Sequence, residues 1–188
     1  RLSGEMLLDS MCNSIAKSGI SVANIGLVTS PILYYAAKKN ASKSGIMITG
    51  SHNPKDDNGI KMVINDKPVS GTEILSLTKY IPEFDETKKG IIKTEIIEDY
   101  INDVLQKISL NNPENLKVVV DCGNGAAGCV APELFKRLGC NVTNLFSEID
   151  GNFPNHHPDP GKLENLQDLI KAVKKENADL GLAFDGDG

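Results

Sequence analysis

Two short segments of the chain carry oxygen-bearing side chains that could take part in chemistry. Ser51 stands in the run Thr-Gly-Ser-His-Asn-Pro over residues 49–54, and His52 follows it directly. Asp185 and Asp187, separated by one glycine, follow a short apolar run. A serine hydroxyl can form a covalent ester, and carboxylate oxygens suit Mg²⁺, which usually takes phosphate oxygens as further ligands. The sequence therefore offers a candidate reactive serine and a candidate magnesium site.

Each of these features also has a purely structural interpretation. Ser51 can be a turn or helix-capping serine, since a glycine precedes it and a proline ends the run. Neighbouring side chains on an extended strand point apart, so Ser51 and His52 make a poor hydrolase dyad. The pair Asp185 and Asp187 can be a solvated acidic turn. The residue types by themselves leave both interpretations open.

Three further features have weaker links to chemistry. The glycine-rich run over 121–128 could cradle phosphate, but its spacing favours tight packing of a strand against a helix. Lys61, taken alone, is typical of a surface lysine. His156 and His157 are adjacent and flanked by prolines, which favours a rigid structural loop over a metal site.

Strand-like and helix-like segments alternate along the chain, which is typical of an α/β layer structure. A charged stretch over 82–90 separates two groups of elements, and this predicts domains at 1–88 and 92–188. The runs at 49–54 and 185–188 both follow predicted strands, and ligands of α/β sheets gather outside the carboxyl ends of strands. The predicted helices cover 3–19, 30–39, 72–80, 96–108, 130–138 and 163–175, and the predicted strands cover 22–28, 45–49, 60–64, 116–120, 141–146 and 180–184.

The composition excludes several classes of protein. The 188 residues include 20 basic and 25 acidic side chains, for a formal net charge of −5, without a basic block. This balance argues against a nucleic-acid or anionic-membrane partner. A hydrophobic share of 40% and a charged share of 24% are typical of a folded globular chain. The apolar runs are far shorter than the roughly 20 residues that a membrane-spanning helix needs.

The cysteines and the chain ends carry two further expectations. Cys12, Cys122, Cys129 and Cys140 form no Cys-x-x-Cys pair and have no histidine at zinc-finger spacing. We therefore expect free, buried thiols and a reducing, cytoplasmic location. The sequence starts at Arg1 without the apolar segment of a signal peptide, and it stops just after a predicted strand. We expect the chain to be a piece of a longer protein.

Several runs, taken together, resemble a known family. The run at 49–54, followed by Asn-Gly-Ile-Lys at 58–61, resembles the phosphoserine loop of the α-D-phosphohexomutases. Asp-Gly-Asp-Gly at 185–188 resembles the start of their metal loop, Asp-Gly-Asp-Gly-Asp-Arg. The segments 120–125 and 150–161 are similar to the bacterial members that act on both mannose and glucose phosphates. This resemblance extends over essentially the whole chain.

The resemblance implies a fold and a set of site residues. The implied fold is α/β, with two consecutive α/β domains whose mixed sheets are sandwiched by helices. These would be the first two of four domains, and domains 3 and 4 of the same chain would be missing. Ser51 would be the phosphorylated serine, and Ser51, Asp185 and Asp187 would hold Mg²⁺. His52 and Lys61 would lie beside the transferred phosphoryl group as catalytic residues.

The resemblance also implies a reaction on small-molecule hexose phosphates. Hexose 1-phosphate and hexose 6-phosphate would interconvert, with hexose 1,6-bisphosphate as intermediate and activator. Gly50 before Ser51 resembles the mannose and glucose members more than the glucosamine members. The family's sugar-recognition loop and the phosphate-binding loop of its fourth domain are absent from these 188 residues. The chain by itself is therefore expected to be inactive.

Two other functions compete with this one. A phosphatase of the haloacid dehalogenase type also places an Asp-x-Asp pair after a strand, and Asp185 would then be the nucleophile. A non-catalytic sugar-phosphate-binding module is the second alternative, in which Ser51 only turns the chain.

Overall fold

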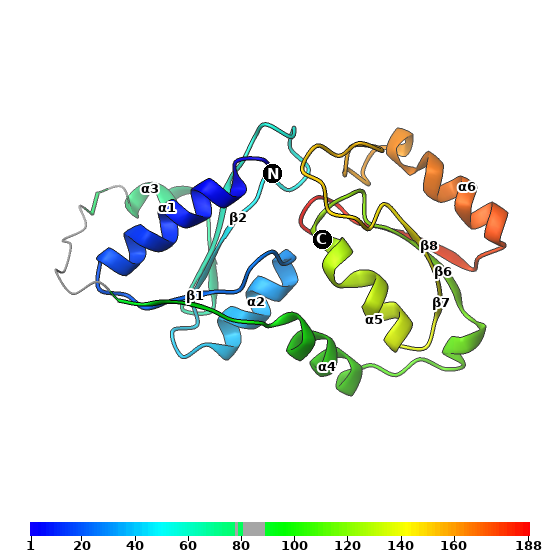
Figure 1. Ribbon diagram of the computed structural model, residues 1–188, viewed down its shortest axis with the longest axis horizontal. Coiled ribbons are helices and arrows are strands. Elements are labelled where there is room, and N and C mark those ends of the chain that lie inside the picture. Colours follow the sequence, from blue (N-terminus) through cyan, green and yellow to red (C-terminus); the bar gives the residue numbers. More distant parts are fainter. Residues whose placement is uncertain (78, 81–88) are drawn as a thin grey trace.

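The computed structural model describes residues 1–77, 79–80 and 89–188, arranged in two parts that meet near the middle of the molecule (Figure 1). Most of the charged stretch predicted over 82–90 lies outside the described residues. The helices are α1 (Gly4–Lys17), α2 (Ser30–Lys39), α3 (Gly71–Leu77), α4 (Ile97–Lys107), α5 (Ala131–Arg137) and α6 (Gln167–Glu176), and the strands are β1 (Val22–Asn24), β2 (Gly45–Ile48), β3 (Ile60–Ile64), β4 (Lys67–Val69), β5 (Ile91–Lys93), β6 (Lys117–Asp121), β7 (Asn141–Leu145) and β8 (Leu180–Ala183).

The first part contains both antiparallel and parallel strand pairs. β2, β3 and β4 form an antiparallel sheet in that order, and Met47 of β2 lies opposite Lys61 of β3. β1 pairs in parallel with β5. A two-residue turn, Asn65 and Asp66, joins β3 to β4, and both residues have positive φ (51° and 65°). Such turns match the twist of hairpin strands and favour the observed pairing of β3 with β4. The loop that carries Ser51 lies at the other end of β3 and joins it to β2, where Ile48 lies opposite Ile60.

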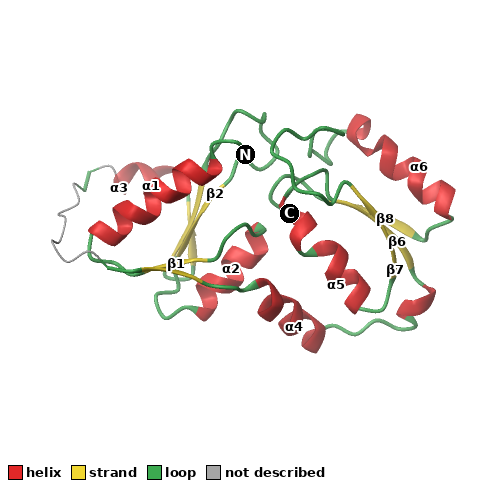
Figure 2. Cartoon of the chain, viewed as in Figure 1, coloured by secondary structure: helices red, strands yellow, loops and turns green. Residues whose placement is uncertain are grey.

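The second part is a parallel sheet between helices. Its strand order is β7-β6-β8, and Val118, Val119 and Val120 of the central β6 are at most 1% exposed. Such complete burial is typical of a parallel strand covered on both faces. Helices α5 and α6 lie on opposite sides of this sheet (Figure 2). Because parallel strands end at the same edge, the loops after β6 and β8 meet there, and the Ala126 N–H donates to the Gly186 carbonyl at 3.1 Å.

A buried apolar cluster extends across the junction of the two parts. Ile32 of α2 (0% exposed) packs in one cluster with Ile101 of α4 (2% exposed) and Val130 at the start of α5. Burial of one such aliphatic side chain contributes roughly 1.5–3 kcal/mol. Apolar packing therefore holds the two parts in a defined relative position.

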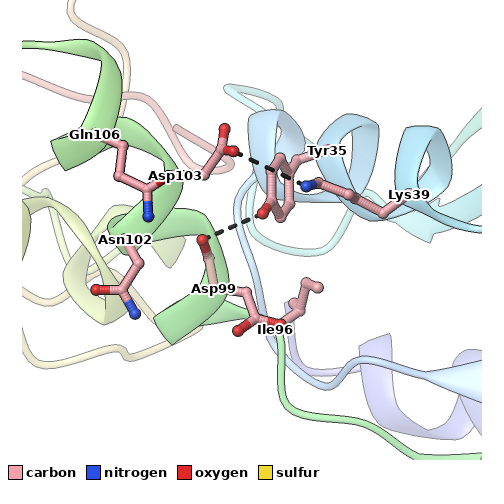
Figure 3. Close-up of a pocket in the computed structure, with 7 residues that line it drawn as sticks. All are labelled: Tyr35, Lys39, Ile96, Asp99, Asn102, Asp103 and Gln106. Atoms are coloured by element: carbon pink, nitrogen blue, oxygen red, sulfur yellow. Dashed lines mark hydrogen bonds and ion pairs between the residues drawn. The ribbon is translucent and has the colours of Figure 1, made fainter.

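A polar pocket of about 320 Å³ borders the same junction, between α2 and α4 (Figure 3). The Tyr35 hydroxyl donates to the Asp99 carbonyl at 3.2 Å, and Lys39 Nζ lies 3.9 Å from Asp103 Oδ1. The Tyr35 ring meets the Tyr100 ring edge-on, with centroids 5.4 Å apart. The pocket shares no residue with the predicted site, and its lining makes contacts between the two parts.

The predicted α/β class, with two consecutive α/β parts covered by helices, is confirmed. Both strand directions occur in the first part, whereas the described sheet of the second part is parallel. Several element bounds also differ. The strand predicted over 22–28 ends at residue 24, and β5 was not predicted. The short strand β4 (Lys67–Val69) was not predicted either. Pro68 is tolerated there because β4 is an edge strand. The longest described helix, α1, has 14 residues, and among the described helices none has the length and apolar character to span a membrane.

All four cysteines are free, as predicted. Cys12, Cys122 and Cys140 are buried, and Cys129 is partly exposed. Burial, with a smaller contribution from the Asp121 charge, raises the pKa of Cys122 to about 12. The thiolate is the reactive form of cysteine, so Cys122 is held in an unreactive state.

This burial predicts slow modification of Cys122. At pH 8, iodoacetamide is expected to label Cys122 in the native protein at least about 100-fold more slowly than in urea, because the buried thiol remains protonated. Peptide mass spectrometry after timed quenching measures the rate at this position. Equal rates in the native and unfolded protein would contradict the burial of this thiol.

Candidate active site

Ser51 is positioned by a loop that β2 and β3 hold at both ends, here called the serine loop (residues 49–59). The Thr49 N–H donates to the Gly59 carbonyl at 2.9 Å and closes the loop. Ser51 has φ +46°, a left-handed conformation that costs a non-glycine residue about 1–2 kcal/mol. Its own N–H donates to Thr49 Oγ1 at 3.0 Å. Backbone strain of this kind is concentrated at functional sites, which makes Ser51 a candidate on structural grounds as well.

The Ser51 side chain meets the loop that follows β8, here called the acidic loop (residues 185–188). The Ser51 hydroxyl donates to Asp185 Oδ2 at 2.5 Å, although 134 positions separate the two residues. His52 Nδ1 lies 3.4 Å from Ser51 Oγ and 4.0 Å from Asp185 Oδ2. The expectation that the Ser51 and His52 side chains point apart is therefore wrong. It assumed an extended strand, whereas the left-handed turn at Ser51 brings the two side chains together.

Asp187 is the most enclosed carboxylate of the acidic loop, with a side chain 7% exposed. Its Oδ2 accepts from Thr49 Oγ1 at 2.8 Å and lies 2.7 Å from Lys61 Nζ. Burial alone would raise the pKa of Asp187, but hydrogen bonds from Lys61 and Thr49, with the Lys61 charge, hold it below its ordinary value. Asp187 is therefore ionised at neutral pH, and Lys61 is its counter-ion rather than an isolated surface lysine.

The acidic loop is held by backbone contacts from both parts. The Ser30 N–H, at the start of α2, donates to the Asp187 carbonyl at 2.8 Å. A side chain at Gly186 would collide with the Ser51 carbonyl. A side chain at Gly125 would come within 3.1 Å of the Gly186 carbonyl. The glycine-rich run after β6 therefore packs closely at Gly125, but against the acidic loop rather than as the predicted contact of a strand with a helix.

The predicted magnesium ligands fit a hard divalent cation in their chemistry. Ser51, Asp185 and Asp187 offer only oxygen donors, and two of these residues are already in contact. The part of the chain that the structure describes contains no group of three or more His, Cys, Asp or Glu side chains arranged for a metal. A cation would therefore need further oxygens, which for Mg²⁺ are commonly those of phosphate and water.

Three residues at the site were not predicted as site residues. Thr49 and Ser30 orient Asp187 by the contacts given above, and Ser30 Oγ also accepts from Lys61 Nζ at 3.1 Å. The side chain of Arg1 donates to the Ser51 carbonyl at 2.5 Å and to the Pro54 carbonyl at 2.8 Å. Thr49 could have been noticed from its place in the serine motif, whereas no local signal connects Arg1 to residues 50 positions away.

The adjacent histidines of the second part both have protein partners. His156 Nε2 lies 3.1 Å from both carboxylate oxygens of Asp121, which is 1% exposed. His157 Nε2 lies 2.7 Å from the His52 carbonyl. These partners favour the structural interpretation of the loop over a metal site.

Comparison with known families agrees with this arrangement. The family description "Phosphoglucomutase/phosphomannomutase, alpha/beta/alpha domain I" matches residues 1–87. The description "Phosphoglucomutase/phosphomannomutase, alpha/beta/alpha domain II" matches residues 98–188. Both matches include the loops that meet at the site, since the serine loop falls in the first and the acidic loop in the second.

Individual relatives are similar over the whole chain. A phosphomannomutase/phosphoglucomutase of Pseudomonas syringae pv. tomato is 53% identical over 100% of this chain and 40% of its own length. The enzyme of that name from Pseudomonas aeruginosa PAO1 is 48% identical, and a phosphoglucomutase of Neisseria gonorrhoeae is 46% identical, each over 100% of this chain and 41% of its own length. The chain thus spans about two fifths of the length of the curated relatives it matches.

A crystal structure shares the fold. The phosphoglucomutase/phosphomannomutase family protein of Burkholderia thailandensis superposes with a TM-score of 0.93 at 42% sequence identity, over 100% of this chain and 43% of that one. Sequence, fold and the meeting of the two loops therefore lead to the same conclusion. The chain belongs to the phosphoglucomutase/phosphomannomutase family and contains its α/β/α domains I and II.

Proposed function

We propose that the whole protein interconverts hexose 1-phosphate and hexose 6-phosphate, with mannose phosphates, glucose phosphates or both as substrates. Ser51 carries the phosphoryl group, and hexose 1,6-bisphosphate is the intermediate and activator. The observation that carries this proposal is the 2.5 Å contact between the Ser51 hydroxyl and Asp185, which joins a strained serine to a carboxylate of the other domain. The names of the relatives support the same reaction class.

In the proposed reaction, a hydroxyl oxygen of the hexose phosphate attacks the phosphorus on Ser51 in line. A P–O bond forms to the sugar and the P–O bond to Ser51 breaks, which gives hexose 1,6-bisphosphate and free serine. The bisphosphate then turns over and returns its other phosphoryl group to Ser51. Phosphoryl transfer depends mainly on positioning and on stabilisation of charge, and two loops fixed by packed strands provide such positioning.

Proton and charge balance are assigned to His52 and Lys61. The sugar hydroxyl loses a proton as it attacks, and the Ser51 oxygen gains one as it leaves. His52 Nδ1, 3.4 Å from Ser51 Oγ, is within reach to exchange that proton. Lys61, beside Asp187, supplies a positive charge for the phosphoryl oxygens. Phosphorylation adds about −1.5 to −2 charges to Ser51, and Mg²⁺ bound by Ser51, Asp185 and Asp187 would offset part of that charge.

The proposed reaction also needs the rest of the protein. The sugar and the distal phosphate would be held by the two further domains of the same chain, so the 188 residues alone are inactive. Residues 1–88 and 92–188 are the two domains present. The free cysteines support a reducing, cytoplasmic location.

Phosphopeptide mapping of the full-length protein tests the proposal. After incubation with glucose 1,6-bisphosphate and Mg²⁺, one acid-stable phosphate is expected on the peptide that contains Ser51. A base-labile phosphate on Asp185 would instead identify a phosphatase with an aspartyl nucleophile. The absence of any protein-bound phosphate would favour a binding module.

A further inference from the structure

The serine loop receives a hydrogen bond from the second domain. His157 Nε2 lies 2.7 Å from the carbonyl oxygen of His52, although 105 positions separate the two residues. A carbonyl oxygen can only accept, so Nε2 carries the proton and donates. The acceptor belongs to the residue directly after Ser51, whose left-handed backbone (φ +46°) depends on outside support.

The backbone of His157 is anchored to the most buried strand of the second domain. His156 Nδ1 lies 3.0 Å from the His157 carbonyl, and His156 Nε2 lies 3.1 Å from both oxygens of Asp121. Asp121, at the end of β6, is 1% exposed and also accepts from the Gly123 N–H at 2.9 Å. A continuous series of polar contacts therefore runs from the sheet core to the serine loop, and His156 faces an acceptor at each ring nitrogen.

The loop that carries His157 (residues 150–161) also supports the Ser51 carbonyl, through a contact between Phe153 and Arg1. The Phe153 ring lies under the guanidinium of Arg1, 4.9 Å from ring centroid to Cζ. That guanidinium donates to the Ser51 carbonyl at 2.5 Å. Between Phe153 and His157, the Asn155 side-chain amide donates to Asn124 Oδ1 at 2.8 Å, and this hydrogen bond limits movement of the loop.

We propose that His157 is a positioning residue for phosphoryl transfer: it fixes the backbone beside Ser51 from the other domain, with the pair His156–Asp121 as its anchor. The effect on phosphoryl transfer rests on the function proposed above, whereas the effect on the loop backbone does not. Displacement of a reacting group by about 1 Å can cost about 100-fold in rate, so a contact of this kind has a measurable effect.

Two variants of the full-length protein separate positioning from folding. His157→Ala removes the donor, and His157→Gln retains a side-chain N–H that can reach a carbonyl. Asn152→Ala is the matched control, because Asn152 lies in the same loop, is exposed and, within the described part of the chain, makes side-chain hydrogen bonds only with Asp150. The measurements are the single-turnover rate of Ser51 phosphorylation from glucose 1,6-bisphosphate, KM, the melting temperature and amide hydrogen exchange over residues 49–59.

We expect His157→Ala to slow phosphorylation of Ser51 about tenfold, the loss expected for one well-placed hydrogen bond. Amide exchange over 49–59 should accelerate, KM and melting temperature should change little, and His157→Gln should recover most of the rate. Unchanged rate and exchange in His157→Ala would overturn the proposal. The proposal would also be overturned if both His157 variants lost the same fraction of the phosphorylation rate and both had a lower melting temperature, because the loss would then come from destabilised folding. If the wild type takes no phosphate on Ser51, the proposed function fails, and the exchange data still decide on His157.

Discussion

Replacement of Ser51 by alanine in the full-length protein is expected to abolish mutase turnover, with a loss of at least about 10⁴-fold in kcat. Alanine lacks the oxygen that would form the phosphate ester, so no phosphoryl group can be stored between the two half-reactions. Serine and alanine both carry a Cβ, so the backbone strain at this position is the same in both proteins. A coupled assay of hexose 1-phosphate conversion measures the loss, and intact mass measures phosphate on the protein.

Two comparisons make this result specific to the Ser51 oxygen. Ser51→Gly relieves the left-handed strain and should be at least as stable as the wild type, yet equally inactive. Ser14→Ala, on an exposed face of α1, should retain full activity, because the Ser14 hydroxyl donates to the Ser10 carbonyl and has no other hydrogen bond to a residue that the structure describes. Activity near the wild-type level in Ser51→Ala would refute the phosphoserine role.

Replacement of Asp187 by asparagine is expected to weaken Mg²⁺ binding at least about tenfold, which corresponds to about 1.4 kcal/mol. Asparagine keeps the shape of the side chain and can still accept from Thr49, but it lacks the negative charge. Lys61, whose Nζ lies 2.7 Å from Asp187 Oδ2, would then keep its positive charge without the Asp187 carboxylate to neutralise it, and it would repel a metal ion. Titration calorimetry with Mg²⁺ on the full-length protein measures the affinity without reference to turnover.

The Mg²⁺ dependence of the rate provides a second measurement of the same change. The concentration for half-maximal rate should rise in parallel with the dissociation constant. Asp168→Asn is the matched control, since the Asp168 carboxylate on α6 is 47% exposed and, among the described residues, pairs only with Lys171. A metal titration of Asp187→Asn that superimposes on the wild type would count against Asp187 as a ligand.

Patterns that are local in the sequence were enough to predict the fold class and most of the helices and strands. Helical spacing of apolar residues located α1 and α4, the Ser-Pro start at 30–31 located α2, and continuous apolar runs located β6 and β8. These patterns work because each depends on neighbours a few positions away. The strand β5 was missed, since three residues with exposed isoleucines carry no periodic signal, and only pairing with the distant β1 makes them a strand.

The sequence by itself determined which residues could react: a serine in a turn motif, a histidine and a lysine close to it, and an acidic pair after a strand. The family resemblance implied that they share a site, and only the tertiary structure decided which of their atoms meet. The contacts of Ser51 with Asp185, of Lys61 with Asp187 and of His157 with the His52 carbonyl each join the two domains. Their residues are more than 100 positions apart, so they depend on how two separately formed sheets pack, and no local periodicity encodes that packing.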